Sequence, residues 1–297
     1  MAFTEFMQNL ANGISLGSLY ALIAIGYTMV YGILRLINFA HGDVLMIAAY
    51  LALFGTAIFT LPWWASFILA IVITALFGGL IERLAYKPLR TSPRISLLIS
   101  AIGVSFLLEN AGLVLFGGRP RAFPRPPIFD HLFNISGVVV QSLTIYIPII
   151  TVVSLIALIY LVNRTKTGMA MRACSRDFET ASLMAINVNN IVSITFIVGS
   201  ALAAIGGIMW ALKFPQINPL MGIFPGLKCF IAAVLGGIGS ISGAVLGGFI
   251  LGVLEILLVA FFPALSGYRD AFAFIILILI LLFKPTGILG EKMTEKV

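Results

Sequence analysis

Few side chains in this sequence could do chemistry, and those that could lie inside or between long apolar runs. The segment "LRLINFAHGD" (34–43) gathers an amide, an imidazole and a carboxylate, and two later apolar runs each hold a carboxylate. Such groups are costly within a lipid bilayer, so they are typical of places where a solute, an ion or a proton passes. The candidates for such a translocation path or gate are Asn38, His41, Asp43, Glu109, Asn110 and Glu255.

Each candidate also has a structural interpretation. Segment 34–43 can be a plain turn, with Gly42 ending one helix and Asp43 capping the next. It can instead be an unwound segment buried in the protein, and its richness in hydrogen-bonding side chains favours this interpretation. For Glu109 and Glu255, a hydrogen bond between helices is favoured over a proton site, because the sequence shows no chain of partners for a relay. We therefore expect the energy for any transport to come from elsewhere.

The sequence contains no catalytic or nucleotide-binding constellation. The two histidines, His41 and His131, belong to no HExxH pattern, and no GxSxG occurs. The stretch "GGIGSISG" (236–243) is not followed by Lys-Ser/Thr or preceded by a strand, which argues against a phosphate-binding loop. Cys174 and Cys229 lack metal-ligand spacing and are expected to be packing residues. We expect no catalytic residue, no metal site and no cofactor held by this chain.

The composition indicates the environment in which these residues must be positioned. Of the 297 residues 61% are hydrophobic and 10% are charged, and the mean hydropathy is +1.12. Soluble domains carry roughly 25% charged residues, so this is a polytopic membrane protein. The net charge of +7 comes from basic residues beside apolar runs. It is therefore read as a signal that holds loops in the cytoplasm, and no nucleic-acid partner is expected.

The apolar runs predict an all-α transmembrane bundle in a single domain, 1–297. A spanning helix needs about 20 apolar residues. The runs of sufficient length are 9–34, 43–60, 64–84, 95–116, 144–162, 190–211, 243–262 and 268–283. A shorter run, 227–238, either crosses the membrane or re-enters it. The total is thus about 8–9 crossings.

Basic loops predict the orientation of these helices. Loops 83–94 and 163–189 each carry several Lys or Arg residues and lie two spans apart, so both are expected on the cytoplasmic side. The C-terminal tail, with Lys284, Lys292 and Lys296, should join them, which requires 227–238 to cross. The chain has no Lys or Arg before residue 35, so we expect the N-terminus outside.

The loop at about 117–143 is then external although it is basic. Its arginines, Arg119, Arg121 and Arg125, could dock an acidic partner such as an external binding protein, or the loop could simply be solvated. The alternation from Val138 to Ile145 predicts a small hairpin after a proline-rich turn.

Small residues crowd the last third of the chain. Gly243 and Gly247, and likewise Gly248 and Gly252, have the GxxxG spacing that lets helices approach closely in lipid. We interpret these glycines as helix-packing positions.

The segment 168–187 is too polar to cross the membrane although spans flank it. We expect a short cytoplasmic helix, after a break at Gly168 and with a stop at Asn187. Its charged part holds Arg172, Arg176, Asp177 and Glu179, and its apolar part holds Ala181, Leu183, Met184 and Ile186. Such a helix can lie on the lipid surface or fill a groove on a partner protein. The mixed charge favours a partner, because binding to lipid favours a basic face.

Within it, "ETASLMAI" (179–186) resembles the coupling-helix motif of ABC importer permeases, in which Glu-Ala-Ala is followed after three residues by Gly. Glu179 and Ala181 match this motif, whereas Thr180 replaces the first Ala and Ala185 replaces the Gly. Segments 12–53, 171–208 and 232–255 resemble the permeases of branched-chain amino acid ABC transporters, of the first of their two paralogous types.

This resemblance implies the ABC importer permease fold and an inner-membrane transport role. A second, paralogous permease, two cytoplasmic ATPase subunits and an external binding protein would be the partners, with ATP held by the ATPases. Leucine, isoleucine, valine or a related amino acid would be the substrate. The residues that would couple the spans to the ATPases are Arg172, Arg176, Asp177, Glu179, Ala181, Ala185 and Ile186.

Three alternatives stay open. A urea or other amide permease of the same family would differ mainly in its binding protein. A stand-alone channel or secondary carrier would transport without partners, and a purely structural subunit would not transport at all. The partner-seeking helix at 168–187 argues against the last two.

Overall fold

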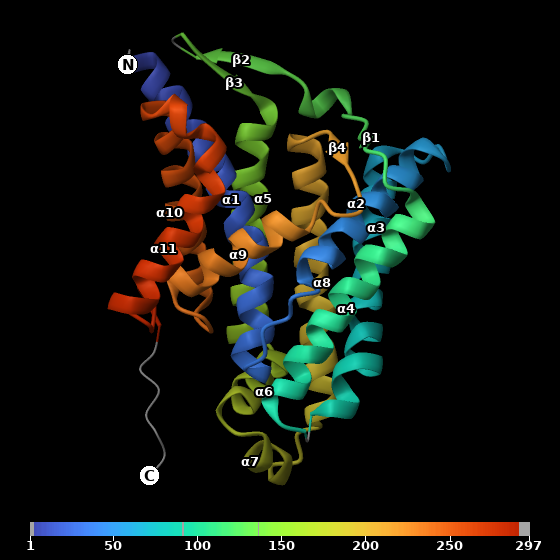
Figure 1. Ribbon diagram of the computed structural model, residues 1–297. Coiled ribbons are helices and arrows are strands. Elements are labelled where there is room, and N and C mark those ends of the chain that lie inside the picture. Colours follow the sequence, from blue (N-terminus) through green and yellow to red (C-terminus); the bar gives the residue numbers. More distant parts are fainter. Residues whose placement is uncertain (1–2, 91, 136, 291–297) are drawn as a thin grey trace.

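The computed structural model describes residues 3–90, 92–135 and 137–290, and these form a bundle of long helices (Figure 1). The helices are α1 (Phe3–Leu34), α2 (His41–Ala57), α3 (Trp63–Ile81), α4 (Arg94–Phe116), α5 (Ser142–Arg164), α6 (Lys166–Arg176), α7 (Phe178–Leu183), α8 (Val188–Lys213), α9 (Ile223–Gly236), α10 (Ile241–Phe261) and α11 (Arg269–Phe283). In the described ranges, seven helical stretches are long and apolar enough to span a membrane. The helices α2 and α9 are apolar but shorter. The predicted all-α membrane bundle is confirmed.

Helix α1 lies at the centre of the bundle. It packs against α10, α8, α5 and α9, and its stretch from Leu19 to Ile25 is fully buried. A helix that is apolar all round is stable only when it is surrounded on all sides. By contrast, Ala273 is the one residue of α11 classed as buried, so this last helix lies at the edge.

Small residues set the distance between α1 and α10. A Cβ added at Gly17 would lie 2.8 Å from Cα of Phe249, and one added at Gly248 would lie 2.6 Å from Cα of Ala21. Gly252 meets the backbone of Gly17 in the same way. The two backbones therefore touch along this face, which is how GxxxG positions act in lipid.

The other pair of glycines faces a different helix. Gly243 lies against the backbone of Gly236, and Gly247 lies against the backbone of Ala232, both on α9. The four glycines of α10 thus serve two neighbours at once. The turn between α9 and α10 also uses Gly237 at φ +110°, in the region that favours glycine.

Two helices begin within the bundle after unwound segments. Residues 35–40 return from the lower end of α1 toward mid-height before α2 starts (Figure 1). Helix α9 starts likewise after a non-helical stretch that follows α8. The two starts meet, because Gly42 lies against the backbone of Gly222 and of Gly226. Non-helical backbone at such depth is tolerated because it is buried in protein.

The two ends of the bundle differ. At one end lie the N-terminal part of α1 and an ordered loop, which contains η3 (Pro127–Phe129) and the strands β1 (Arg121–Ala122), β2 (Leu132–Ile135) and β3 (Val138–Gln141). Strand β1 pairs with β4 (Gln216–Ile217), and β2 pairs with β3. At the other end lie α6 and α7 (Figure 1). The predicted hairpin exists but ends at Gln141, since α5 begins at Ser142 and includes Ile145.

The remaining short elements extend two spanning helices. A π-helical turn, η1 (Glu82–Tyr86), and a 3₁₀ turn, η2 (Lys87–Leu89), continue α3, and η4 (Pro263–Tyr268) leads into α11.

Candidate functional site

The unwound segment after α1 is held in place by a buried hydrogen bond. The hydroxyl of Tyr86 donates to Oδ1 of Asn38 across 2.8 Å, and both side chains are buried. The interpretation of 34–43 as a simple exposed turn is therefore wrong. The segment is a structured part of the interior, attached to the lower end of α3.

Asp43 and Glu109 come together beside the start of α2. The hydroxyl of Ser105 donates to Oδ2 of Asp43 across 2.5 Å, and Asp43 is 2% exposed. A cavity of about 90 Å³ opens between these residues, with Gly222 and Tyr27 also in its wall. The two carboxylates thus share one small chamber formed by α2, α4 and the start of α9.

His41 lies beside Tyr27 of the chamber wall but does not itself line the chamber. Its ring packs on Tyr27, with 4.4 Å between centroids, and lies against Gly26 of α1. It is 1% exposed, and its Nε2 has no hydrogen-bond partner among the described residues. Its position is that of a packing group between α1 and α2.

Asn110 lies outside the chamber. It is exposed on α4, and its Nδ2 donates to the carbonyl of Phe106 in its own helix across 2.7 Å. The structure therefore separates Asn110 from its neighbour Glu109.

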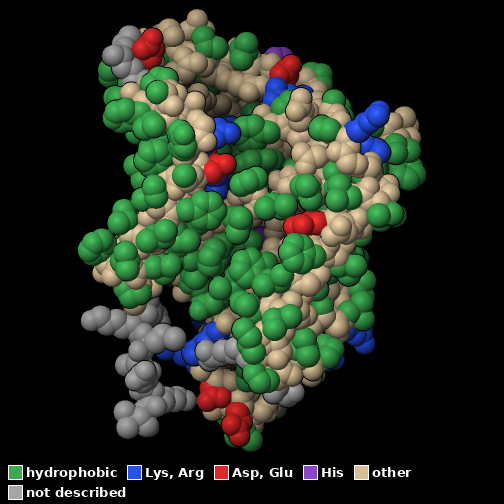
Figure 2. Space-filling view, viewed as in Figure 1, with side chains coloured by type: hydrophobic (Ala, Val, Ile, Leu, Met, Phe, Trp, Pro, Cys, Tyr) green, Lys and Arg blue, Asp and Glu red, His purple; other side chains and the backbone are tan. Residues whose placement is uncertain are grey.

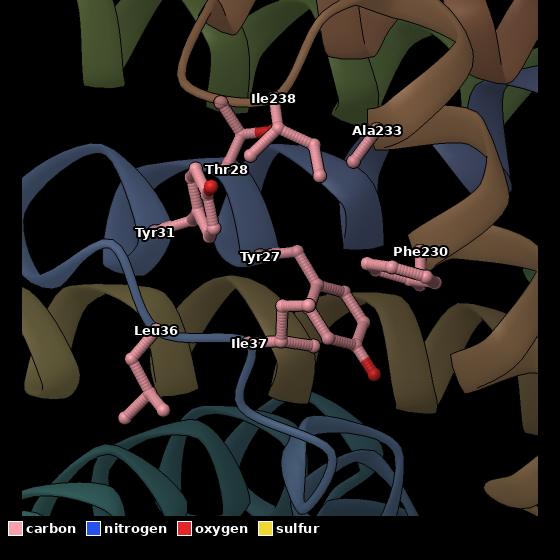
Figure 3. Close-up of a pocket in the computed structure, with 8 residues that line it drawn as sticks. All are labelled: Tyr27, Thr28, Tyr31, Leu36, Ile37, Phe230, Ala233 and Ile238. Carbon is pink, nitrogen blue, oxygen red and sulfur yellow. The ribbon is translucent and has the colours of Figure 1, made fainter. Parts of the chain in front are cut away.

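A small, mostly apolar pocket lies below the chamber. Figure 3 shows the ring of Tyr27 of α1 beside Ile37 of the unwound segment and near Phe230 of α9, while the ring of Tyr31 lies on the side of Thr28 and Ile238. The space enclosed by these residues is about 10 Å³, roughly the size of one water molecule. These mostly apolar residues lie on the α6–α7 side of the chamber, and we call them the plug.

Glu255 lies in a separate cluster of charges. Its Oε2 accepts from the hydroxyl of Tyr20 across 2.8 Å, and its Oε1 lies 2.8 Å from Nζ of Lys228. Lys228 is in turn 2.6 Å from Oδ1 of Asp270, and Arg269 lies 3.8 Å from Oε1 of Glu255. The hydrogen bond between helices that the sequence favoured for Glu255 is present, within a larger network.

Sequence reasoning missed most of this network. Lys228 interrupts the apolar run "LKCFIAAVLGG" (227–237), and an ionisable residue at such a place is itself a signal. Asp270 and Arg269 stand at the start of α11, where they look like ordinary loop residues. Asp270 pairs with Lys228, 42 positions earlier, and Arg269 pairs with Glu255, 14 positions earlier, and both pairings are visible only in the fold.

A third buried carboxylate, which sequence reasoning missed, ties together the α6–α7 end. Glu82 is fully buried and forms an ion pair with Arg90, and the hydroxyl of Ser193 donates to its Oε2 across 2.5 Å. Arg90 also donates to Oδ1 of Asn189 across 2.6 Å. The base of α3 is thereby fixed to the base of α8.

The expected single helix at 168–187 is two helices that meet at a bend. The chain breaks at Thr165, whose hydroxyl accepts from the backbone N–H of Gly168 across 3.0 Å, so Gly168 lies in the first turn of α6. Asp177 then caps α7 by accepting from the N–H groups of Glu179 and Thr180. Its carboxylate therefore shapes the bend itself. We call residues 165–187 the elbow.

The predicted stop, Asn187, begins the next helix. Its side chain accepts from the N–H of Asn190 across 3.2 Å and so caps α8. Just before it, Ala185 has φ +59°, the left-handed conformation that glycine adopts most easily. The turn expected from a glycine is thus present with alanine in its place.

The elbow presents both apolar and charged groups to the outside. Leu183 and Met184 are 81% and 74% exposed, and Arg172, Arg176 and Glu179 are exposed as well. Ala181 is instead buried against the chain's own core, and Ile186 is half-buried. Exposed apolar side chains of this size, beside charges at the tip of a bundle, are typical of a protein contact.

Comparison with known proteins identifies the family. Residues 9–281 match the family described as branched-chain amino acid transport system, permease component. The permease protein BraD of Pseudomonas aeruginosa, of a high-affinity branched-chain amino acid transport system, is 45% identical over 99% of this chain and 98% of its own length. The corresponding LivH of Escherichia coli is 43% identical over 99% of both chains. A probable LivH of Methanocaldococcus jannaschii is 30% identical over 95% of this chain and 91% of its own.

The chain belongs to this family of permease components. It is an ABC importer permease and a multi-pass inner-membrane protein, and it is not an enzyme. As a permease component of such a system, it works with separate ATPase subunits and a substrate-binding protein.

The loop arginines of this permease have different roles. Arg125 donates to the carbonyl oxygens of Leu212 and Lys213 across 2.6 and 2.8 Å, so it caps the end of α8. Arg121 donates to the carbonyl of Phe116 across 2.6 Å and caps α4. Arg119 is exposed, and among the described residues its guanidinium forms no hydrogen bond or ion pair. The first two arginines are thus engaged within the chain, and Arg119 is the one whose head group is available to a partner.

Proposed function

We propose that this permease forms, with a second paralogous permease, an ATP-driven import path for leucine, isoleucine, valine or a related aliphatic amino acid. The names of the relatives at 43–45% identity support this substrate class. ATP would bind on the partner ATPases, and this chain would hold no cofactor. We also propose that the path lies at the surface that this chain shares with the second permease.

The elbow carries this proposal. It lies at one end of the bundle, is fixed by the caps of Thr165, Asp177 and Asn187, and exposes Leu183 and Met184. A rigid protrusion with an apolar tip and a charged flank suits a groove on a partner protein. Arg172, Arg176 and Glu179 would supply the charged contacts. Ala181 would support the elbow from inside, while Ala185 and Ile186 shape its last turn.

The elbow also defines the proposed orientation. If the ATPases dock there, the α6–α7 end is cytoplasmic, and the N-terminal end of α1 and the loop at 117–143 are external (Figure 1). The basic groups around Arg90 would then be cytoplasmic, as their charge predicts. Lys284 follows α11 at that side, whereas Lys292 and Lys296 lie outside the described residues.

Movement of the elbow would open the apolar plug. Arg172 of α6 donates to the carbonyl of Val162 in α5, so the elbow and α5 are joined directly. Helix α6 also packs against α1, which carries Tyr27 and Tyr31 of the plug. We propose that Asp43 and Glu109 line the chamber above this gate, and that Asn38 holds the gate segment in place.

A test is to purify the permease with its neighbouring permease and ATPase gene products, and to compare the native protein with Leu183→Ser/Met184→Ser. The expected result is loss of the ATPases from the double variant and loss of leucine uptake in proteoliposomes. Leu132→Ser is a matched control, since Leu132 is 69% exposed at the opposite end. Retention of coupled uptake by the double variant, or uptake by the permease alone, would overturn the proposal. Competition by urea instead of leucine would point to an amide permease.

A further inference from the structure

A large cavity with charged walls lies beside the Glu255 network, away from the chamber at Asp43. Its volume is about 370 Å³, and it is formed by α1, the end of α8, the start of α9, the end of α10 and the start of α11. Figure 2 shows basic and acidic side chains close together on the upper part of this face, bordering a hollow. The cavity is large enough for a small organic solute, since ligand pockets begin at roughly 300 Å³.

The charges that line this cavity do not balance. Lys213, Lys228 and Arg269 are basic, whereas Glu255 and Asp270 are acidic, which leaves one positive charge in excess. The four charges of the network are paired with one another. Lys213 is not: its Nζ donates to the hydroxyl of Ser15 across 2.7 Å and makes no ion pair with a described carboxylate. A half-buried ammonium of this kind suits an anionic group such as a carboxylate.

An acceptor for a cation lies in the same wall. Both oxygens of Glu255 already accept, one from Tyr20 and one from Lys228. Asp270 uses Oδ1 for Lys228 and is 42% exposed at its side chain. A carboxylate has room for about four hydrogen bonds, so the second oxygen of Asp270 can accept from an ammonium group.

The rest of the wall is apolar and aromatic. The residues that line it are Leu16 of α1, Trp210 of α8, Phe214 directly after α8, Phe224 of α9 and Ile256 of α10. The ring of Trp210 stacks on Tyr20 and also packs on Phe214, so this wall is ordered. An apolar lining with a few placed polar groups is typical of a site for a small, partly apolar ligand.

We propose that this cavity is a binding site for the transported amino acid. Its carboxylate would pair with Lys213, its ammonium group with Asp270, and its aliphatic side chain would lie against Trp210 and Phe224. The inference rests on the proposed function. The cavity lies at the end of α8 remote from the elbow, which is the external side in the proposed orientation.

Protection of an engineered cysteine tests this site directly. Asn12 lines the cavity and is half-buried, so Asn12→Cys should react with a small thiol reagent. Both native cysteines are buried, and burial raises the pKa of the Cys174 thiol, so neither should react at a comparable rate. In the purified complex with ATPases and second permease, saturating leucine should slow labelling of Asn12→Cys several-fold, in proportion to occupancy of the site. A complex that carries Thr60→Cys instead of Asn12→Cys is the control, since Thr60 is exposed and lies outside the cavity.

A second variant assigns the carboxylate contact. Lys213→Met keeps an unbranched side chain but removes the ammonium group. It leaves the Lys228–Glu255–Asp270 pairs in place, so any structural role of that network is unaffected. We expect the leucine concentration needed for protection to rise about tenfold or more, as for loss of a charge-assisted hydrogen bond. Leucinamide lacks the carboxylate, so it should protect poorly when Lys213 is present. Its protection should be the same in the Lys213→Met variant.

Two results would overturn the inference. Labelling of Asn12→Cys that is indifferent to leucine, in a complex that still transports leucine, would place the substrate elsewhere while leaving the importer function intact. Protection by anionic phospholipid with none by leucine would make the cavity a lipid site. Failure of the complex to transport leucine at all would instead contradict the proposed function.

Discussion

The hydroxyl group of Tyr86 donates a 2.8 Å hydrogen bond to Oδ1 of Asn38, and so connects the π-helical end of α3 to the unwound segment that precedes α2. Both residues are buried, at 1% and 5% exposure. Loss of the donor would leave the amide oxygen of Asn38 without a partner in a place that water cannot easily reach. The bond is therefore expected to stabilise the gate segment.

Tyr86→Phe tests that bond. We expect the free energy of unfolding to fall by about 1–3 kcal/mol, the range for an unsatisfied buried polar group. Thermal unfolding in detergent measures this effect. Tyr160→Phe is the matched control, because Tyr160 is 63% exposed. Equal transition temperatures for the two variants would show that the bond does not matter for stability.

The left-handed residue in the elbow gives a prediction of opposite sign. Ala185→Gly should raise stability by up to about 1 kcal/mol, because relief of a left-handed alanine outweighs the greater freedom of glycine in the unfolded chain. Ala173→Gly, within helix α6, should lower stability by about 0.5–1 kcal/mol. Protease digestion of the elbow would report the local effect, and faster cleavage of Ala185→Gly than of the native chain would contradict the argument.

Removal of one partner from the buried network should be costly. Lys228→Met removes the cation nearest to the Glu255 carboxylate and is expected to destabilise the permease by about 3–5 kcal/mol. The double variant Lys228→Met/Glu255→Met removes both charges and should recover much of that loss. Yield of monodisperse protein and the unfolding temperature are the measurements. A double variant that is worse than Lys228→Met alone would refute mutual compensation.

Substitutions at two glycines distinguish the cost of overpacking between helices from the effect of helix propensity. Gly248→Ala places a Cβ against the backbone of Ala21 and should cost about 1–3 kcal/mol, as overpacking does. Gly103→Ala is the counterpart on α4, where no atom lies within 4 Å of the added Cβ. It should stabilise by up to about 1 kcal/mol through helix propensity. Similar unfolding temperatures for both would mean that α1 and α10 can separate without cost.

The loop arginines predict different losses. Arg125→Ala removes two bonds to the end of α8 and should lower stability by about 1–3 kcal/mol, because those carbonyl groups lose charged donors. Arg119→Ala should leave stability within about 0.5 kcal/mol, as for other surface changes. If an external protein binds this loop, Arg119→Ala should weaken the binding of that protein by more than the small change in the stability of the permease explains. Binding of the purified binding protein to the complex measures this.

The sequence predicted the seven long apolar helices well because each of them is a long apolar run with clear ends. The candidate residues were harder to place, because a helix face cannot be read from composition. Glu109 and Asn110 are adjacent in the sequence, yet one lines a chamber and the other is exposed on α4. Similarly, Asp177 looked like a surface charge, whereas it caps α7.

Long-range pairing accounts for the rest. The partners of Lys228 lie in α10 and α11, and no periodicity in the sequence points to them. The bend between α6 and α7 was missed because a charged stretch with good helix formers resembles one helix. Arg125 was interpreted as a surface group because its partners are backbone carbonyls 87 and 88 residues away.

The contact between Gly42 and Gly222 has a mechanical consequence. Here backbone meets backbone, and no side chain lies between them that could change rotamer and absorb a displacement. The starts of α2 and α9 can therefore tilt about this contact or separate from each other. Neither can slide past the other by small adjustments. A movement that pushes the start of α9 against α2 is therefore expected to displace α2 as well.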